Sequence, residues 1–202
     1  MSKNFNARVK YSLIFSVLFF IVAVWVHTGA SYNFDWFIYE NICKIRNNFL
    51  TAFMMFITYF GDTVAVIAAA LISLFIAYIF KCKNYCLDIL AISAFQHICN
   101  RILKIIFQRA RISEMMLVHE SSYSFPSGHT MTAVVLWGFF VYLMSKGEYR
   151  KYRIIPFIMI FLIGFSRIYL GAHYFTDVLG AMLISLPILI LEITVLEKMK
   201  RI

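Results

Sequence analysis

The sequence lacks any stretch that would divide the chain. Across its 202 residues there is no linker, no low-complexity tract and no internal repeat, so we expect one domain over residues 1–202. The four cysteines, Cys43, Cys82, Cys86 and Cys99, fall in different segments, and none has the paired spacing that is typical of a zinc site. We therefore expect them to be packing residues.

Charged residues are also scarce. They make up only 14% of the chain, whereas 62% is hydrophobic and the mean hydropathy is +0.79, far above an ordinary soluble domain. The net charge of +9 could suggest nucleic-acid binding, but such proteins concentrate basic residues on a water-exposed face. Here the basic residues punctuate apolar segments, which argues against a nucleic-acid partner and indicates an integral membrane protein.

Apolar runs recur along the whole chain at about the 20-residue length that crosses a bilayer as a helix. The six expected transmembrane helices are residues 11–28, 63–80, 85–107, 127–145, 154–172 and 176–195. Between the first and second spans, residues 32–39 and 49–60 are expected to form short interfacial helices, and Asp62 suits the N-cap of the second span. The expected fold class is therefore all-α, an integral membrane bundle of six transmembrane helices.

The start of the chain admits two interpretations. Lys3, Arg8 and Lys10 precede an apolar run, as in a secretory signal, but Thr28 and Ala30 make a poor cleavage pattern. Because the rest of the chain is itself membrane-spanning, we expect a retained first helix. With six crossings, most of the 19 lysines and arginines lie on the side of the two termini. This distribution predicts a multi-pass protein of the cytoplasmic membrane, with both termini cytoplasmic.

Polar residues gather at three places on the side opposite the termini. One cluster runs from Lys104 to Arg111 at the end of the third span, and a second is Pro126–His129 at the start of the fourth. The third runs from Ser166 to Asp177 around the turn between the last two spans. Since ionisable residues at membrane depth are functional by default, folding is expected to gather the three clusters into one site at the outer face.

The first set of residues predicts phosphate binding. Lys104, Arg111 and Arg167 would supply cationic donors, and the arginines can form bidentate bonds to an oxyanion. Ser127 and Gly128, at the start of a helix, would add backbone N–H groups and the positive end of the helix dipole.

The second set predicts group transfer. His173 and Asp177 are four residues apart, so on one helical turn the carboxylate would fix the imidazole tautomer and leave the other ring nitrogen free to attack. His129 would protonate the departing group. Two alternatives are a polar staple between helices and a metal site. The surrounding cations would repel a metal ion, so we expect no metal and no other cofactor.

These residues resemble the motifs of the type 2 phosphatidic acid phosphatase superfamily. Its P-S-G-H motif is intact at Pro126–His129, and its S-R, H, D motif is intact at Ser166, Arg167, His173 and Asp177.

The first motif of that superfamily, a lysine and an R-P pair separated by six residues, is met only in part. Lys104 and Arg111 match, whereas Ile112 replaces the proline. Arg109 could share or replace the role of Arg111. His97, Asn100 and Arg101 are interpreted as structural, and Glu120 could line the site or solvate the loop.

The resemblance implies a metal-independent lipid phosphatase that forms a phosphohistidine at His173 and hydrolyses it with water. Length and plan resemble the small bacterial phosphatidylglycerophosphatases. The substrate could be phosphatidylglycerophosphate, undecaprenyl pyrophosphate or phosphatidic acid, and membrane lipids would be its surroundings; no protein partner is indicated. A phosphotransferase of the same fold is an alternative, and a non-catalytic transporter of lipid or anions is another.

Overall fold

The computed structural model describes residues 2–81, 83–145 and 148–199. The expectation for Cys82 lies outside them, as does the side chain of Lys3. All regular elements in these ranges are helices, which confirms the all-α class. They are α1 (Ser2–His27), α2 (Tyr32–Lys44), α3 (Asn48–Thr58), η1 (Tyr59–Gly61), α4 (Thr63–Phe80), α5 (Cys86–Phe107), α6 (Gly128–Met144), η2 (Glu148–Arg153), α7 (Ile154–Tyr169) and α8 (Phe175–Lys198).

Five helical segments in the described ranges are long and apolar enough to cross a membrane. They are Phe5–His27, Thr63–Phe80, Cys86–Phe107, Glu148–Tyr169 and Phe175–Lys198. The remaining expected span is α6, an apolar helix of 17 residues. The chain is therefore a multi-pass membrane protein, and the expected span ends agree with the helices to within a few residues, except at the start of α1.

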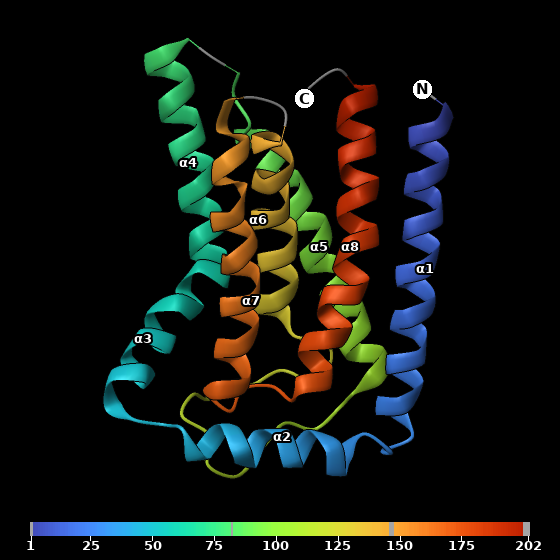
Figure 1. Ribbon diagram of the computed structural model, residues 1–202, viewed down its shortest axis with the longest axis vertical. Coiled ribbons are helices and arrows are strands. Elements are labelled where there is room, and N and C mark those ends of the chain that lie inside the picture. Colours follow the sequence, from blue (N-terminus) through green and yellow to red (C-terminus); the bar gives the residue numbers. More distant parts are fainter. Residues whose placement is uncertain (1, 82, 146–147, 200–202) are drawn as a thin grey trace.

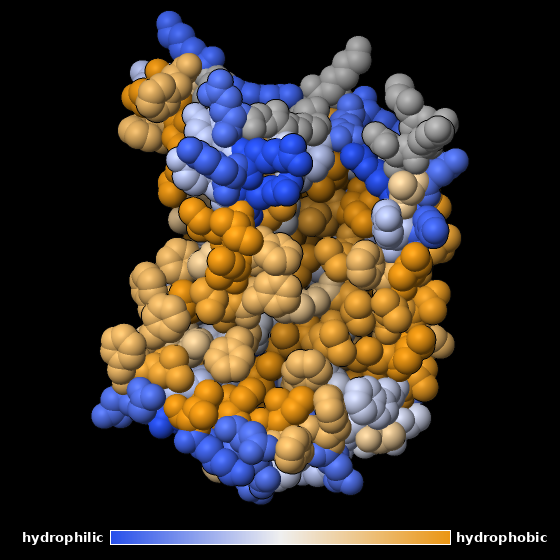
Figure 2. Space-filling view, viewed as in Figure 1, coloured by the Kyte–Doolittle hydropathy of each residue, from blue (hydrophilic) through white to orange (hydrophobic). Residues whose placement is uncertain are grey.

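The long helices run side by side, and α2 lies across one end of them (Figure 1). Both chain ends lie at the opposite end of the bundle. On the face in view, apolar side chains form a broad band across the middle of the molecule, and hydrophilic residues lie above and below it (Figure 2). This distribution is the one expected where lipid surrounds the middle and water reaches both ends.

Helix α6 forms the centre of the bundle. It packs mainly against α7 and α8 and also against α5. Met131, Val135 and Phe139 on α6 are fully buried. Gly138 lets α8 come close, because a Cβ at that position would lie 2.5 Å from Cδ2 of Leu189, as small residues commonly do between membrane helices. The first turn of α6, which carries His129, is therefore held in place by the core.

The two expected short helices are present as α2 and α3 with η1, and polar contacts attach them to the rest of the chain. Tyr39 of α2 is fully buried, and its hydroxyl donates to the carbonyl of Glu114 at 3.0 Å. Arg46, between α2 and α3, donates from Nε to the carbonyl of Tyr169 at 2.9 Å. Asn47 caps α3 by accepting from the N–H of Leu50. Helix α2 is thereby fixed over the end of the bundle.

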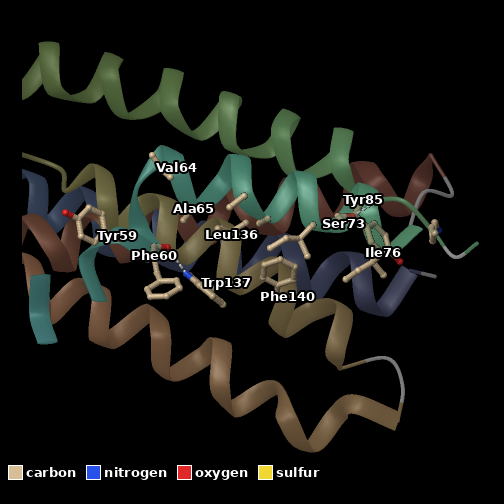
Figure 3. Close-up of a pocket in the computed structure, with 14 residues that line it drawn as sticks. Tyr59, Phe60, Val64, Ala65, Ser73, Ile76, Tyr85, Leu136, Trp137 and Phe140 are labelled. Carbon is tan, nitrogen blue, oxygen red and sulfur yellow. Dashed lines mark hydrogen bonds between the residues drawn. The ribbon is translucent and has the colours of Figure 1, made fainter. Parts of the chain in front are cut away.

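An apolar groove of about 550 Å³ lies between α4 and α6 (Figure 3). Small side chains of α4, including Ala65 and Ala68, leave room for it. At one end the indole nitrogen of Trp137 donates to the carbonyl of Phe60 at 3.0 Å. None of the described residues that line it is a histidine or a carboxylate, so the titratable clusters lie elsewhere.

Candidate active site

Ser127 begins helix α6. Its backbone is extended, and its hydroxyl accepts from the N–H of Thr130 at 3.4 Å and from the Thr130 hydroxyl at 3.0 Å. Its own N–H donates to the carbonyl of Asp177 at 3.2 Å, and the residue is fully buried. The N–H of Ser127, which was expected to contact phosphate, therefore has an internal partner in this structure.

The three polar clusters meet at one cavity of about 230 Å³. Five of the residues singled out in the sequence line it, from α5, the loop after α5, the first turn of α6 and the turn before α8. They are Lys104, Arg111, Gly128, His129 and His173. These five supply two imidazoles and two cations to one space large enough for a small anion, and His97, Arg101, Asp62 and Glu120 line the same space.

Asp177 and Arg167 lie behind this cavity. Arg167 is 2% exposed and donates to the Thr58 hydroxyl at 2.8 Å. It also forms an ion pair with Glu120, whose side chain lines the cavity. Among the described residues nothing accepts from Nε of Arg167, although that atom is buried. Arg167 therefore contributes charge from the wall of the cavity.

His173 and Asp177 do not share a helical turn, which corrects the expectation. Helix α8 begins at Phe175, and Tyr174 before it is extended. The two side chains still face each other, with Nδ1 of His173 3.4 Å from Oδ2 of Asp177. That oxygen also accepts from the N–H of Tyr174 at 3.0 Å and from the hydroxyl of Ser124. Capping of the helix therefore also orients the carboxylate.

The two arginines of the first cluster lie in different places. Nη1 of Arg111 is 3.4 Å from Nε2 of His173. Arg111 also donates to the carbonyl of Ala172 at 2.5 Å and to the hydroxyl of Ser122 at 3.1 Å. Nζ of Lys104 donates to the same hydroxyl at 2.8 Å. Arg109 does not line this cavity; its Nη1 instead lies 2.6 Å from Oδ1 of Asp177, so Arg111 is the one of these two arginines that lines the cavity.

Burial lowers the pKa of two cavity residues outside the helices, His173 and Arg111. It lowers the pKa of His173 to about 3, and the Asp177 carboxylate, which favours the protonated ring, offsets this only in part. Burial also lowers the pKa of Arg111, although neighbouring carboxylates oppose the change. His173 is therefore a neutral imidazole near pH 7, which is the form that can act as a nucleophile.

Several cavity residues were given no place in the site from the sequence. Asn100, interpreted as structural, does donate to the carbonyl of Pro126 at 3.1 Å, and it also lines the cavity. Its position one helical turn before Lys104 was an available signal, since both must lie on the same face. Asp62 was expected only as a cap, which it is, yet it also lines the cavity. Ser122 lies in an irregular loop, where no periodicity marks a site.

Comparisons with known proteins define the class. The family model described as the PAP2 superfamily matches residues 85–201, which include all three motifs. The chain belongs to this superfamily, and it is a membrane phosphatase.

Two relatives carry the comparison further. The chain is 32% identical to phosphatidylglycerophosphatase B of Bacillus subtilis (strain 168) over 191 residues, covering 92% of this chain and 94% of the relative. It is 36% identical over 84 residues to lipid phosphate phosphatase delta of Arabidopsis thaliana, covering 38% and 20% of the two chains.

Two solved structures share the fold. The crystal structure of a transmembrane PAP2 type phosphatidylglycerolphosphate phosphatase from Bacillus subtilis aligns with a TM-score of 0.86 at 31% identity, covering 94% of this chain and 98% of the other. That of Aquifex aeolicus LpxE aligns with a TM-score of 0.64 at 25% identity, covering 78% and 93%.

Proposed function

We propose that this protein hydrolyses a phosphate monoester or pyrophosphate of a membrane lipid through a phosphohistidine at His173. The observation that carries the proposal is the single cavity onto which His129, His173, Lys104 and Arg111 open. The resemblance to named lipid phosphatases supports the lipid as substrate.

In the first step Nε2 of His173 attacks phosphorus, because Nδ1 faces Asp177 and Nε2 faces the cavity side at Arg111. The nitrogen–phosphorus bond forms, and the bond from phosphorus to the lipid oxygen breaks. His129 gives its proton to that oxygen. Lys104 and Arg111, with Arg167 behind them, stabilise the charge on the equatorial oxygens. The N–H groups of Gly128 and His129, at the start of α6, would add the positive end of the helix dipole.

In the second step water attacks the phosphohistidine. His129 takes the proton of this water, the nitrogen–phosphorus bond breaks, and orthophosphate leaves with His173 restored. No step requires a metal ion, since protein cations supply the charge stabilisation. The reaction should therefore continue in the presence of a chelator.

The proposed placement in the membrane uses six crossings: the five long apolar helices and α6. Both termini are then cytoplasmic, the cavity lies at the outer face of the cytoplasmic membrane, and α2 and α3 lie at the interface. The side of the termini carries most lysines and arginines. The substrate headgroup enters from the outer leaflet while its hydrocarbon chains remain in lipid.

Among the candidate substrates, phosphatidylglycerophosphate comes first, because the Bacillus subtilis relative that covers almost the whole chain carries that name. Undecaprenyl pyrophosphate and phosphatidic acid present the same terminal phosphate to the cavity. A phosphate-release panel of these three lipids in detergent, with and without a chelator, ranks them by kcat/KM.

The decisive experiment combines His173→Ala, His129→Ala and trapping of the phosphoenzyme. His173→Ala should abolish phosphate release, and His129→Ala should reduce it by about 10²–10⁴-fold, the usual contribution of a general acid. Rapid quenching of His129→Ala with labelled lipid should show acid-labile phosphate on the protein, absent from His173→Ala. Wild-type rates in a folded His173→Ala variant would refute the mechanism, and transfer of label to a second lipid without free phosphate would indicate a phosphotransferase.

A further inference from the structure

Helix α2 contributes a buried carboxylate that the mechanism above does not use. Asp35 is fully buried, although it lies on the helix that crosses the end of the bundle (Figure 1). Its Oδ1 accepts from the N–H of Thr176 at 2.9 Å, and its Oδ2 accepts from the Thr176 hydroxyl at 2.6 Å. A buried carboxylate is retained only where charge and hydrogen bonds compensate its lost hydration, and here those contacts lead to the first turn of α8.

Arg109 joins this carboxylate to Asp177. One guanidinium nitrogen, Nη2, lies 2.7 Å from Oδ2 of Asp35, and the other, Nη1, lies 2.6 Å from Oδ1 of Asp177. The guanidinium also lies over the ring of Tyr174, 4.3 Å from its centroid. Because a guanidinium is planar and presents its donors at fixed angles, the two carboxylates are held in one geometry. The pKa of Arg109 is raised, because the two carboxylates outweigh the effect of burial.

The charges along this chain of contacts alternate. When His173 attacks phosphorus, its ring gains positive charge, and Asp177 stabilises that charge. Arg109 in contact with Asp177 opposes this effect, unless a second carboxylate balances the guanidinium. Asp35 is that second carboxylate. We propose that Asp35 is a positioning residue that acts through Arg109 to keep Asp177 oriented and fully effective toward His173.

This inference rests on the proposed function. It also gives different roles to Arg109 and Arg111, which are two residues apart. Arg111 faces the anion, whereas Arg109 forms an ion pair with Asp177, the carboxylate beside the nucleophile. Asp35 would then tie the membrane-surface helix to the reaction centre without touching the substrate.

The test is Asp35→Asn, which preserves shape and keeps an acceptor for Thr176 while removing the charge. The expected result is a fall in kcat of about 10-fold, the lower end of the range known for hydrogen-bond partners of metal-binding histidines, with KM unchanged because no substrate contact is lost. Glu40→Gln is the matched control: it removes a carboxylate from the exposed side of the same helix and should leave kcat unchanged.

A double-mutant cycle separates the proposed route from a general structural role. In an Arg109→Gln background, Asp35→Asn should cost little further activity, because the charge that Asp35 balances is gone. If Asp35→Asn aggregates in detergent, Arg109→Lys, which keeps the charge but loses the two-sided contact, should show the same loss of kcat at constant KM.

Three outcomes overturn the inference: wild-type kcat in Asp35→Asn, an equal loss in both backgrounds, or a loss confined to KM. They differ from failure of the proposed function, in which the wild-type protein itself would release no phosphate from any lipid of the panel.

Discussion

At the scale of single residues, the site depends on which nitrogen of His173 is free. Nδ1 faces Asp177 and Nε2 faces Arg111, so the proton belongs on Nδ1 and the lone pair on Nε2. Burial keeps this neutral form dominant by lowering the pKa of His173 to about 3. The proposed nucleophile would thus be ready at neutral pH without a separate base.

The lowered pKa predicts that His173 does not titrate where histidine normally does. With ¹³C-labelled histidine in micelles, the ring signal that is missing from His173→Gln should stay constant from pH 8 to pH 5. The same pKa shift makes the stability of the fold depend on pH. Below about pH 6.5 the imidazole of His173 binds a proton in the unfolded chain, whereas in the folded chain it stays neutral down to about pH 3. The stability that the neutral His173 contributes is therefore lost as the pH falls from about 6.5 toward 3. A titration midpoint near 6.5 would contradict the assignment.

The position of Arg111 predicts a specific loss of catalysis. Arg111→Gln should lower kcat/KM by about 10²–10³-fold, because a preorganised donor to the reacting phosphate is removed. Arg101→Gln removes the same charge from an exposed residue that lines the same cavity and should cost much less. Steady-state phosphate release measures both, and equal losses would show that only the general positive field matters.

Most of the site residues could be predicted, because each cluster is local in sequence. His173 with Asp177 and Pro126–His129 are short patterns whose chemistry can be read directly. The occupied N–H of Ser127 could not be foreseen, since its acceptor is the carbonyl of Asp177 on another helix. The partnership of Arg109 with Asp35 joins residues 74 positions apart, and no local pattern encodes it.

At the scale of helices, the contact between η1 and α6 positions His129. Gly61 lies so close that a Cβ there would be 2.6 Å from Cγ2 of Ile163 and 3.0 Å from the carbonyl oxygen of His129. The absence of a side chain at Gly61 lets the start of α4 reach the cavity.

Gly61→Ala should therefore destabilise the protein by about 1–3 kcal/mol through overpacking and lower kcat by displacing His129. Thermal unfolding in detergent and phosphate release measure the two effects. Adding Ile163→Leu, which removes the clashing branch methyl, should recover part of both. A variant as stable and active as the wild type would show that this contact is easily relieved.

The apolar runs predicted the helices well, because length and hydropathy are local properties. Residues 63–80 coincide with α4, and 85–107 differ from α5 by one residue. The course of α2 could not be predicted in the same way. Its place across the bundle depends on Tyr39 and Arg46, whose partners lie in the loop after α5 and at the end of α7.

At the scale of the whole molecule, the polar ends and the apolar middle seen in Figure 2 agree with a protein that is embedded in a bilayer. The termini lie at one end and α2 at the other (Figure 1). The cavity is at the end near α2, because it is lined by the first turn of α6 and the turn before α8. In the proposed mechanism, substrate and water would therefore reach the cavity from the end opposite the termini.

The shortness of α6 has a physical consequence for the substrate lipid. Its 17 residues extend for only about 25 Å, against a hydrocarbon thickness of roughly 30 Å. In the proposed six-span placement the longer outer helices set the hydrocarbon thickness around the central α6, so the headgroup must sink to meet Gly128 and His129. In vesicles with the same substrate fraction, turnover should rise as the acyl chains of the host lipids become shorter. The enzyme would then be tuned by membrane thickness as well as by headgroup chemistry.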